Sequence, residues 1–369
     1  MNIVQIISSG GFYGAEAMVL HLSRALRDRG HAVTFGLLVN EQNPHRELAE
    51  RARQAGIEAV EIPCRGRLDF STIRRLRELI LEKSGQIIHS HGYKSNLYAL
   101  AAKGAGKIPL VSTCHNWTNQ TAALRVYASL DRMALRRFQR VFCVCAAVRV
   151  KLLDSGVPAN KIHLIENGVP MSDFCDAPAT STKITSEPGP RIGMVGRLVE
   201  QKGFHFVLKA APGIVKRFPT ARFLIVGEGG YREELLSLSR RLGIESNVLF
   251  LGQREDMPSV YRSLDVFVLP SLNEGMPMTL LEAMASGLPA IATRVGAVPT
   301  VINDQQTGVL IEPGDVGSVQ TALEQLLDAP DFKLKLARNG QAWVRAHASI
   351  ETAAGKYSEH YQDVLANAA

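Results

Sequence analysis

Two glutamates, Glu274 and Glu282, bracket a Gly-Met-Pro turn at the start of a predicted helix. Apolar residues over 265–270 and 290–293 predict a buried parallel strand on either side. A strand, a tight turn and a helix N-terminus form the corner where open α/β sheets bind phosphate-bearing ligands. There, one carboxylate can hold a sugar hydroxyl and the other a ribose diol. The alternative is two solvated helix acids, but the setting favours ligand binding.

Two cations follow the first predicted strand of the second half of the chain. Arg197 comes directly after Gly196, and Lys202 directly before Gly203 and a helix. Arginine offers a planar fork of donors and lysine a mobile point charge, a combination that suits a diphosphate. The alternative is an ordinary pair of surface charges.

A glycine pair, Gly10 and Gly11, follows the first predicted strand of the chain and leads into a helix. Glycines let the backbone approach a ligand and place amide donors at a helix N-terminus. The Gly-x-Gly-x-x-Gly spacing is absent, which disfavours a nicotinamide-dependent oxidoreductase. A generic strand-to-helix turn is the alternative.

Three histidines, His89, His91 and His115, stand at predicted strand ends in the first half. His115 follows a buried run directly, so we expect it to face the ligand. A neutral imidazole there can hydrogen-bond a sugar hydroxyl or carry a proton. The alternative is a satisfied core histidine. No Ser-His-Asp or Cys-His order stands out, and the three histidines do not have metal-ligand spacing.

Strands and helices alternate along both halves, which predicts parallel sheets covered on both faces. Small, polar and proline residues over 171–190 predict a linker between the halves. In the first half we expect strands at 2–8, 31–39, 58–62, 87–89, 109–114 and 141–145, and helices at 15–29, 46–55, 70–83, 94–103 and within 127–139. In the second we expect strands at 191–195, 222–226, 248–250, 265–270, 290–293 and 307–311, and helices at 204–217, 232–242, 258–263, 315–328, 331–347 and 350–366.

The chain's 369 residues, 46% of them hydrophobic and 21% charged, are typical of a globular protein of two domains. The first residues do not form a signal peptide, and no stretch approaches the ~20 apolar residues of a membrane span. We expect reduced core thiols in a cytoplasmic protein, with Cys143 and Cys145 on opposite faces of one strand. The five cysteines are Cys64, Cys114, Cys143, Cys145 and Cys175.

The net charge of +7 is concentrated in the first half. Residues 1–185 hold 24 Lys and Arg against 15 Asp and Glu, whereas 186–369 hold 18 against 20. These charges form either solvated helix faces or a surface that attracts anionic lipid or an acidic substrate. Nucleic acid is disfavoured because no recognition motif accompanies the charge. The clusters are Arg74, Arg75 and Arg77, and Arg132, Arg136, Arg137 and Arg140.

Together these motifs resemble the retaining nucleotide-sugar glycosyltransferases of GT-B fold, family four, known as glycosyl transferases group 1. The most specific match is the pair of acids eight positions apart, Glu274 and Glu282. Supporting matches are Gly196-Arg197, Lys202-Gly203, Val226-Gly-Glu-Gly229, Glu166-Asn-Gly-Val169, Gly10-Gly11, Ala15-Glu16 and His115. Family members commonly carry an aromatic residue where this chain has Met276.

The resemblance implies two doubly wound Rossmann-like α/β domains that face a central cleft. The expected acceptor-side domain is 1–170 plus a returning helix over 350–369, and the expected nucleotide-sugar domain is 191–349. Arg197 and Lys202 would neutralise the donor's diphosphate, and Glu274, Glu282 and His115 would hold hydroxyls of its sugar and ribose. The backbone near Gly275, Met276, Pro277 and Thr279 would hold the sugar and phosphate, Gln253 and Arg254 the base, and Gly10 and Gly11 the diphosphate.

The reaction implied is front-face transfer with retention, without a protein nucleophile, metal or cofactor. The expected partners are a nucleoside-diphosphate-sugar and a lipid-linked or cell-envelope glycan acceptor, with peripheral contact to an anionic membrane at its inner face. The alternatives are a nucleotide-sugar epimerase of the same fold and a non-catalytic nucleotide-sugar-binding module.

Overall fold

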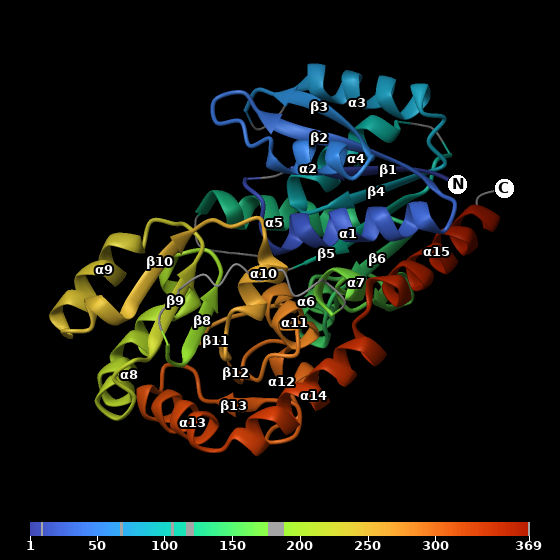
Figure 1. Cartoon of the computed structure of the whole chain (residues 1–369). Helices are drawn as coiled ribbons and strands as arrows, with labels where there is room; N and C mark the ends of the chain where they lie inside the picture. The colour runs from blue at the N-terminus through green and yellow to red at the C-terminus, as the bar shows by residue number, and fades with distance from the viewer. Residues whose placement is uncertain (9, 67–68, 105–106, 116–121, 176–187, 368–369) are drawn as a thin grey trace. The chain divides into compact units, whose positions relative to one another are not determined.

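The computed structural model describes residues 1–8, 10–66, 69–104, 107–115, 122–175 and 188–367. The chain forms two compact units (Figure 1). Unit 1 is Met1–Gly168 with Ile350–Ala369, and unit 2 is Val169–Ser349. Most of the predicted linker, 176–187, lies outside the described residues. Each unit is a parallel sheet flanked by helices, so the predicted α/β class is confirmed.

Unit 1 contains a seven-stranded parallel sheet in the order β3-β2-β1-β4-β5-β6-β7. Its central strands are buried almost throughout, so none alternates between apolar and polar residues; β1 is largely apolar, and β4 and β5 begin apolar and end in buried polar residues. The strands are β1 Asn2–Ile7, β2 Ala32–Asn40, β3 Glu58–Cys64, β4 Ile87–His91, β5 Leu110–Cys114, β6 Arg140–Cys143 and β7 Ile162–Leu164. The helices are α1 Gly14–Asp28, α2 Glu47–Gln54, α3 Phe70–Glu82, α4 Tyr93–Lys103, α5 Ala122–Leu135, α6 Ala146–Asp154 and α15 Ile350–Ala366.

Unit 2 contains a six-stranded parallel sheet in the order β10-β9-β8-β11-β12-β13. Apolar strand residues such as Ile192 and Val268 pack in one core with Leu208 of α8 and Leu323 of α13. The strands are β8 Arg191–Val195, β9 Arg222–Val226, β10 Val248–Gly252, β11 Val266–Leu269, β12 Ala290–Thr293 and β13 Val309–Ile311. The helices are α7 Met171–Phe174, α8 Phe204–Arg217, α9 Arg232–Arg241, α10 Met257–Arg262, α11 Met278–Ala285, α12 Val298–Val301, α13 Val316–Asp328 and α14 Pro330–His347.

The strand order reverses once in each sheet, and these reversals locate the ligand-binding edges. In unit 1 the order reverses between β1 and β4, and in unit 2 between β8 and β11. At such a point the chain leaves neighbouring strands in opposite directions, which opens a crevice outside their carboxyl ends. The segments after β1, β4, β8 and β11 therefore have the best position to bind a ligand.

Helix α15 returns to unit 1, as predicted. Tyr357 and Tyr361 are fully buried there. The Tyr361 hydroxyl lies 2.6 Å from His89 Nδ1 on β4, and the Arg29 guanidinium after α1 donates to the Glu351 carbonyl at 2.8 Å. The last helix is therefore part of the first unit's core.

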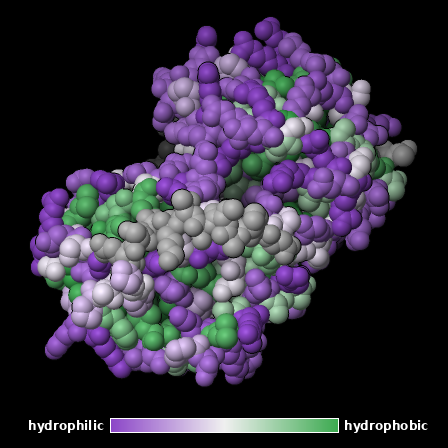
Figure 2. Space-filling model, viewed as in Figure 1, coloured by the Kyte–Doolittle hydropathy of each residue, from purple (hydrophilic) through white to green (hydrophobic). Residues whose placement is uncertain are grey.

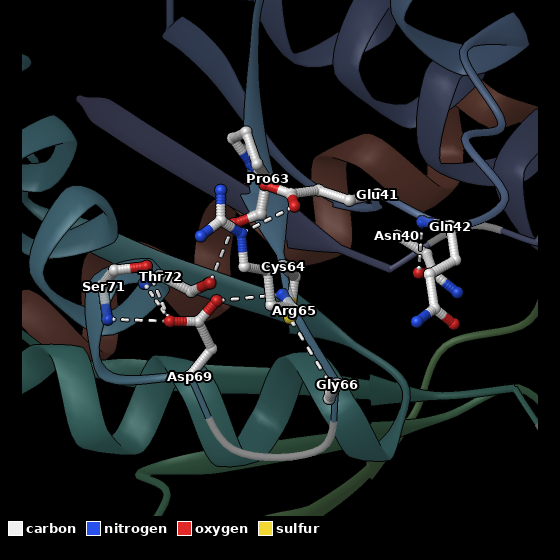
Figure 3. Close-up of polar contacts among 10 residues, drawn as sticks. All are labelled: Asn40, Glu41, Gln42, Pro63, Cys64, Arg65, Gly66, Asp69, Ser71 and Thr72. Carbon is white, nitrogen blue, oxygen red and sulfur yellow. Dashed lines mark hydrogen bonds and ion pairs between the residues drawn. The ribbon is translucent and has the colours of Figure 1, made fainter.

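The turn from β3 to α3 shows how side chains fix a helix start at the carboxyl edge of unit 1 (Figure 3). Asp69 is the N-cap, and its carboxylate accepts from Ser71 N at 2.9 Å and from Ser71 Oγ at 2.6 Å. These hydrogen bonds hold the pKa of Asp69 well below its usual range. Beside the cap, the exposed Arg65 pairs with Glu41 at 2.7 Å. A cap of this kind satisfies helix amides that otherwise have no partner.

Helix α6 and strand β7 were absent from the predicted elements. Strand β7 has three residues at the edge of the sheet, and Leu164 at its end is 44% exposed, so no apolar run marks it. Only Val148 and Leu152 of α6 are buried. Two apolar positions one turn apart are too few to establish a period.

Several predicted boundaries were wrong near α5 and β6. The helix expected within 127–139 is α5, which spans Ala122–Leu135. Beyond it the amides of Arg137 and Phe138 donate to carbonyls three residues back, and Gln139 N donates to the Leu110 carbonyl and leads into β6. The strand expected over 141–145 ends at Cys143, and Cys145 is the N-cap of α6. Cys143 and Cys145 therefore do not alternate along one strand; both are buried, and all five cysteines are free thiols.

Candidate active site

Lys202 and Glu274 meet at the reversal point of unit 2. Lys202 closes the short turn after β8, and Glu274 lies in the loop between β11 and α11. The Lys202 ammonium donates to Glu274 Oε1 at 2.6 Å, and the Ser271 hydroxyl donates to the same oxygen at 2.6 Å. The two charged side chains are 20% and 10% exposed. Such a pair is desolvated enough to be strong and open enough to meet a ligand.

The Glu274 loop is anchored from the strand ends beneath it. The buried Thr293 hydroxyl at the end of β12 donates to the Ser271 carbonyl at 2.5 Å. Ala297 N donates to the Gly275 carbonyl at 2.9 Å. The carboxylate of Glu274 is thus held by its own loop as well as by Lys202.

Two glycines make the close approach of these segments feasible. A Cβ atom on Gly203 would lie 2.0 Å from the Pro270 carbonyl oxygen, and one on Gly296 would lie 2.0 Å from the Glu274 carbonyl oxygen. Both residues also have a positive φ, which side chains rarely tolerate. Any other residue at either position would push the Lys202 or Glu274 segment away.

Helix α11 begins just beyond Glu274, with Pro277 as its N-cap. The first amides of the helix, that of Thr279 among them, have no carbonyl one turn earlier to bind. The Thr279 hydroxyl oxygen is buried and has no hydrogen-bond partner among the described residues. Met276, two residues after Glu274, is buried at 5% exposure. The helix N-terminus therefore offers donors and partial positive charge to an anion.

Glu282 lies within α11 and is buried at 8% exposure. The Tyr261 hydroxyl of α10 donates to Glu282 Oε2 at 2.8 Å. Burial raises the pKa of the Glu282 carboxyl to about 7, and the hydrogen bond from Tyr261 opposes that shift. No described residue donates to Glu282 Oε1 in this structure. The carboxyl therefore titrates near neutral pH, unlike a solvated helix acid.

The remaining predicted residues of unit 2 are more exposed. Arg197 stands two residues after the end of β8 and is exposed, as is Gln253 after β10. The Arg254 guanidinium forms a two-point ion pair with Asp256, at 2.8 and 2.7 Å. Because the Arg254 side chain is engaged with Asp256, a contact from this segment to a nucleotide base would come from the backbone of the segment.

Three further predicted residues, Gly10, Gly11 and His115, belong to unit 1. Gly11 is buried and Gly10 exposed, just before α1, where Tyr13 N donates to the Glu16 carboxylate at 3.1 Å. His115 follows β5 and is half-buried. Its Nε2 lies 3.3 Å from His91 Nδ1, and burial lowers the pKa of His115 to about 4.

Both His89 and His91 were expected at the end of a strand, but only His91 ends one. Strand β4 runs to His91, so His89 lies inside it and is fully buried. Burial lowers the pKa of His89 to about 3 and that of His91 well below its usual range. His89 is a core residue, whereas His91 contacts His115.

Ser271, Thr293, Tyr261 and Gln5 were missed at the sequence level, although each contacts or supports a predicted residue. Ser271 could have been found, because it stands three residues before Glu274 at a strand end. Tyr261 stands 21 positions before Glu282 and Gln5 stands 86 before His91. Only the fold brings those pairs together.

Comparison with known proteins identifies the class to which this fold and site belong. A family model described as Glycosyltransferase Family 4 matches residues 12–173, and one described as Glycosyl transferases group 1 matches residues 189–329. HepE from Anabaena, solved with UDP-glucose, superposes with a TM-score of 0.87 at 20% identity, covering 98% of this chain and all of that one. The fold is therefore that of the GT-B glycosyltransferases.

Two curated relatives extend over most of the chain. A phosphatidyl-myo-inositol mannosyltransferase from Mycolicibacterium smegmatis is 31% identical over 90% of this chain and 86% of its own length. A UDP-Gal:alpha-D-GlcNAc-diphosphoundecaprenol alpha-1,3-galactosyltransferase from Escherichia coli is 29% identical over 81% of each. This chain belongs to glycosyltransferase family four, the glycosyl transferases of group 1.

Proposed function

We propose that this glycosyltransferase moves a sugar from a nucleoside-diphosphate-sugar to a hydroxyl of a lipid-linked or cell-envelope acceptor, with retention at the anomeric carbon. The observation that carries the proposal is the pairing of Lys202 with Glu274 beside the N-terminus of α11. A cation, a carboxylate and free helix amides at one strand edge match the diphosphate and hydroxyls of such a donor.

In the proposed reaction the bond between the anomeric carbon and the donor phosphate oxygen breaks as the acceptor oxygen bonds to the same face of that carbon. The acceptor's proton passes to the departing phosphate oxygen, so the products are a glycoside and a nucleoside diphosphate. Lys202, Arg197 and the α11 amides would stabilise the growing charge on the leaving group. Glu274 and His115 would hold sugar hydroxyls, and Glu282 those of the ribose.

The cations Arg197 and Lys202 also support metal-independent transfer, because they supply countercharge to the leaving diphosphate. If EDTA-treated protein turns over at the same rate as untreated protein, the result would support metal-independent transfer. A requirement for Mg²⁺ or Mn²⁺ would contradict it.

A membrane-associated acceptor is favoured by the surface of unit 1. Apolar side chains are exposed among arginines and lysines on α5 and α6, and within the described residues no helix is long and apolar enough to cross a membrane. Hydrophilic residues cover most of unit 1 on the face in Figure 2, so peripheral contact would depend on charge. The exposed apolar residues are Leu130, Met133, Val150 and Leu153, and the exposed basic ones are Arg136, Arg137, Arg149 and Lys151.

Transfer can be tested with donors and acceptors named for relatives of this chain. UDP-galactose, UDP-glucose and GDP-mannose are each offered with phosphatidylinositol or N-acetylglucosaminyl-diphosphoundecaprenol in vesicles. We expect one pairing to yield nucleoside diphosphate together with a glycolipid whose anomeric configuration, measured by the one-bond carbon–proton coupling at the anomeric carbon, matches the donor's. An inverted product would refute retention, and an altered free sugar formed without acceptor would indicate an epimerase.

Variants connect that activity to the site. Glu274→Gln should lower kcat by about 10²- to 10³-fold, the usual effect of removing one group that stabilises a transition state. Glu233→Gln on α9, a 78% exposed carboxylate, is the matched control and should keep full activity. Equal activity of both variants would place the active site elsewhere.

Membrane contact is tested apart from turnover. Vesicles containing phosphatidylglycerol should bind the protein at low salt and release it as salt rises, since surface attraction is screened. Equal binding to neutral phosphatidylcholine vesicles would contradict a role for the basic residues. The proposal includes a cytoplasmic location at the inner face of the membrane.

A further inference from the structure

A buried chain of hydrogen bonds connects Gln5 to His115 across three strands of unit 1. Gln5 lies on β1, His91 at the end of β4 and His115 just after β5. His91 Nε2 lies 2.7 Å from Gln5 Oε1, and His91 Nδ1 lies 3.3 Å from His115 Nε2. Gln5 and His91 are 0% and 4% exposed, so water does not compete for the bond between them, whereas His115 at the other end is half-buried.

The side-chain carbonyl of Gln5 decides which ring nitrogens of His91 and His115 carry protons. A carbonyl oxygen only accepts, so His91 must carry its proton on Nε2 and leave Nδ1 as an acceptor. His115 must then donate from Nε2 to His91 Nδ1. Its own Nδ1 is left as an acceptor, and no described residue hydrogen-bonds to it. A neutral imidazole has one donor and one acceptor nitrogen, so Gln5 determines the tautomers of both His91 and His115.

The surroundings keep both rings neutral. The groups facing His91 are Gln5, His89 with a ring centroid 4.2 Å away, and His115. His89 is itself occupied by Tyr361 at 2.6 Å and by Thr113 at 2.8 Å, so it does not take part in the chain. Burial lowers the pKa of all three histidines, and none of these partners carries a charge at neutral pH.

We propose that Gln5 and His91 are positioning residues that fix His115 as the Nε2–H tautomer, so that Nδ1 accepts a hydrogen bond from a hydroxyl of the bound ligand. The link to the ligand rests on the proposed function, since it takes His115 as a contact of the donor sugar. The tautomer itself is a property of unit 1 and is measurable without substrate.

The first experiment measures the tautomer in the ligand-free full chain. The protein is labelled with ¹⁵N-histidine, and the His115 resonances are identified by their loss in His115→Gln. At pH 7.5 we expect a protonated Nε2 and an unprotonated Nδ1. In Gln5→Met, which removes the carbonyl at similar volume, the His115 signals should move toward a mixture of tautomers. An unchanged His115 tautomer in a folded Gln5→Met protein would overturn the proposal.

Two further variants test the direction and the specificity of the effect: Gln5→Glu should reverse the His115 tautomer, and Thr113→Val is the control. A carboxylate at position 5 would favour doubly protonated His91, whose Nδ1–H would donate to His115 and reverse its tautomer. Thr113→Val removes a partner of His89 in the same buried region but leaves the Gln5–His91–His115 chain intact, so it should not change the His115 signals. A change in Thr113→Val as large as that in Gln5→Met would show general disturbance of the core and refute a specific chain.

Kinetics separate this inference from the proposed function. If His115 Nδ1 holds the donor sugar, Gln5→Met should lower kcat/KM by about 5- to 10-fold, the value of one net hydrogen bond, and Thr113→Val should not. The pH dependence of kcat/KM in Gln5→Glu should gain an ionisation absent from the unmodified protein. A changed tautomer with unchanged turnover would support the chain and refute the sugar contact of His115.

Discussion

The ammonium of Lys202 lies 2.6 Å from a carboxylate oxygen of Glu274, although the two residues stand 72 positions apart. Without a ligand, the two groups that we assign to the donor's diphosphate and sugar therefore neutralise each other. A donor that brings a diphosphate to Lys202 would compete for this ammonium. The Ser271 hydroxyl, which donates to the same carboxylate oxygen, would keep Glu274 in place during that exchange.

Lys202→Met and Glu274→Gln should not have additive effects on turnover. Each should lower kcat by about 10²-fold or more, and the double variant should be far less impaired than the product of the two. Residues that act as one unit behave in this way. Steady-state kinetics of all four proteins at saturating donor provide the measurement, and strictly multiplicative losses would contradict a shared role.

Glu282→Gln should stabilise the protein at high pH. The pKa of Glu282 is raised from 4.5 to about 7 in the folded state, so its contribution to stability is fully present below pH 4.5 and is lost as pH rises through 7. The advantage of the glutamine should grow by about 3 kcal/mol between pH 4 and pH 8. Urea unfolding of both proteins at several pH values would measure this growth. A stability difference that does not depend on pH would refute the raised pKa of Glu282.

Gly296→Ala should disturb the Glu274 loop. The added methyl carbon would stand 2.0 Å from the Glu274 carbonyl oxygen at a backbone φ of +55°. We expect a loss of about 1–3 kcal/mol in unfolding free energy and lower kcat. Gly317→Ala is the control, because its new carbon would meet Asp315 Oδ1 at an ordinary 3.4 Å. Similar stability of the two variants would show that the loop accommodates the methyl group.

Asp69→Ala should destabilise unit 1 by about 1 kcal/mol, as expected for the loss of an N-cap. Because the pKa of Asp69 is lowered in the folded state, its stabilising effect is present above its unfolded pKa and is lost as pH falls. Thermal unfolding at pH 7 and pH 3 should show a smaller deficit in acid. Asp69→Asn keeps an acceptor oxygen without the charge, so its deficit at pH 7 should be smaller than that of the alanine variant and should also shrink in acid. Deficits that do not change with pH would contradict a role for the charge.

The sequence predicted the fold well where burial determines composition. Apolar runs such as 191–195 and 222–226 match strands β8 and β9 because both faces of a central parallel strand are covered. It failed for β7, where an edge strand of three residues needs no such run.

Site prediction was limited by long-range pairing. Glu274 and Lys202 could be singled out because each lies in the segment that follows an apolar strand. Their mutual contact could not be predicted, nor could the Tyr261 hydroxyl on Glu282, because these depend on strand order and helix placement. Sequence motifs therefore identified candidate residues, and the fold supplied the partners that set their protonation and orientation.

The return of α15 to unit 1 has a consequence for biosynthesis. Tyr357 and Tyr361 are translated after the whole of unit 2, yet they cover His89 and Thr113 in the middle of the first sheet. Until the ribosome has released that helix, His89 and Thr113 of a nascent unit 1 would keep their mutual hydrogen bond but would lack the two tyrosines that cover them. A nonsense mutation before residue 350 would leave this defect permanent, so the earliest segment to be synthesised would be the one exposed to proteases and chaperones.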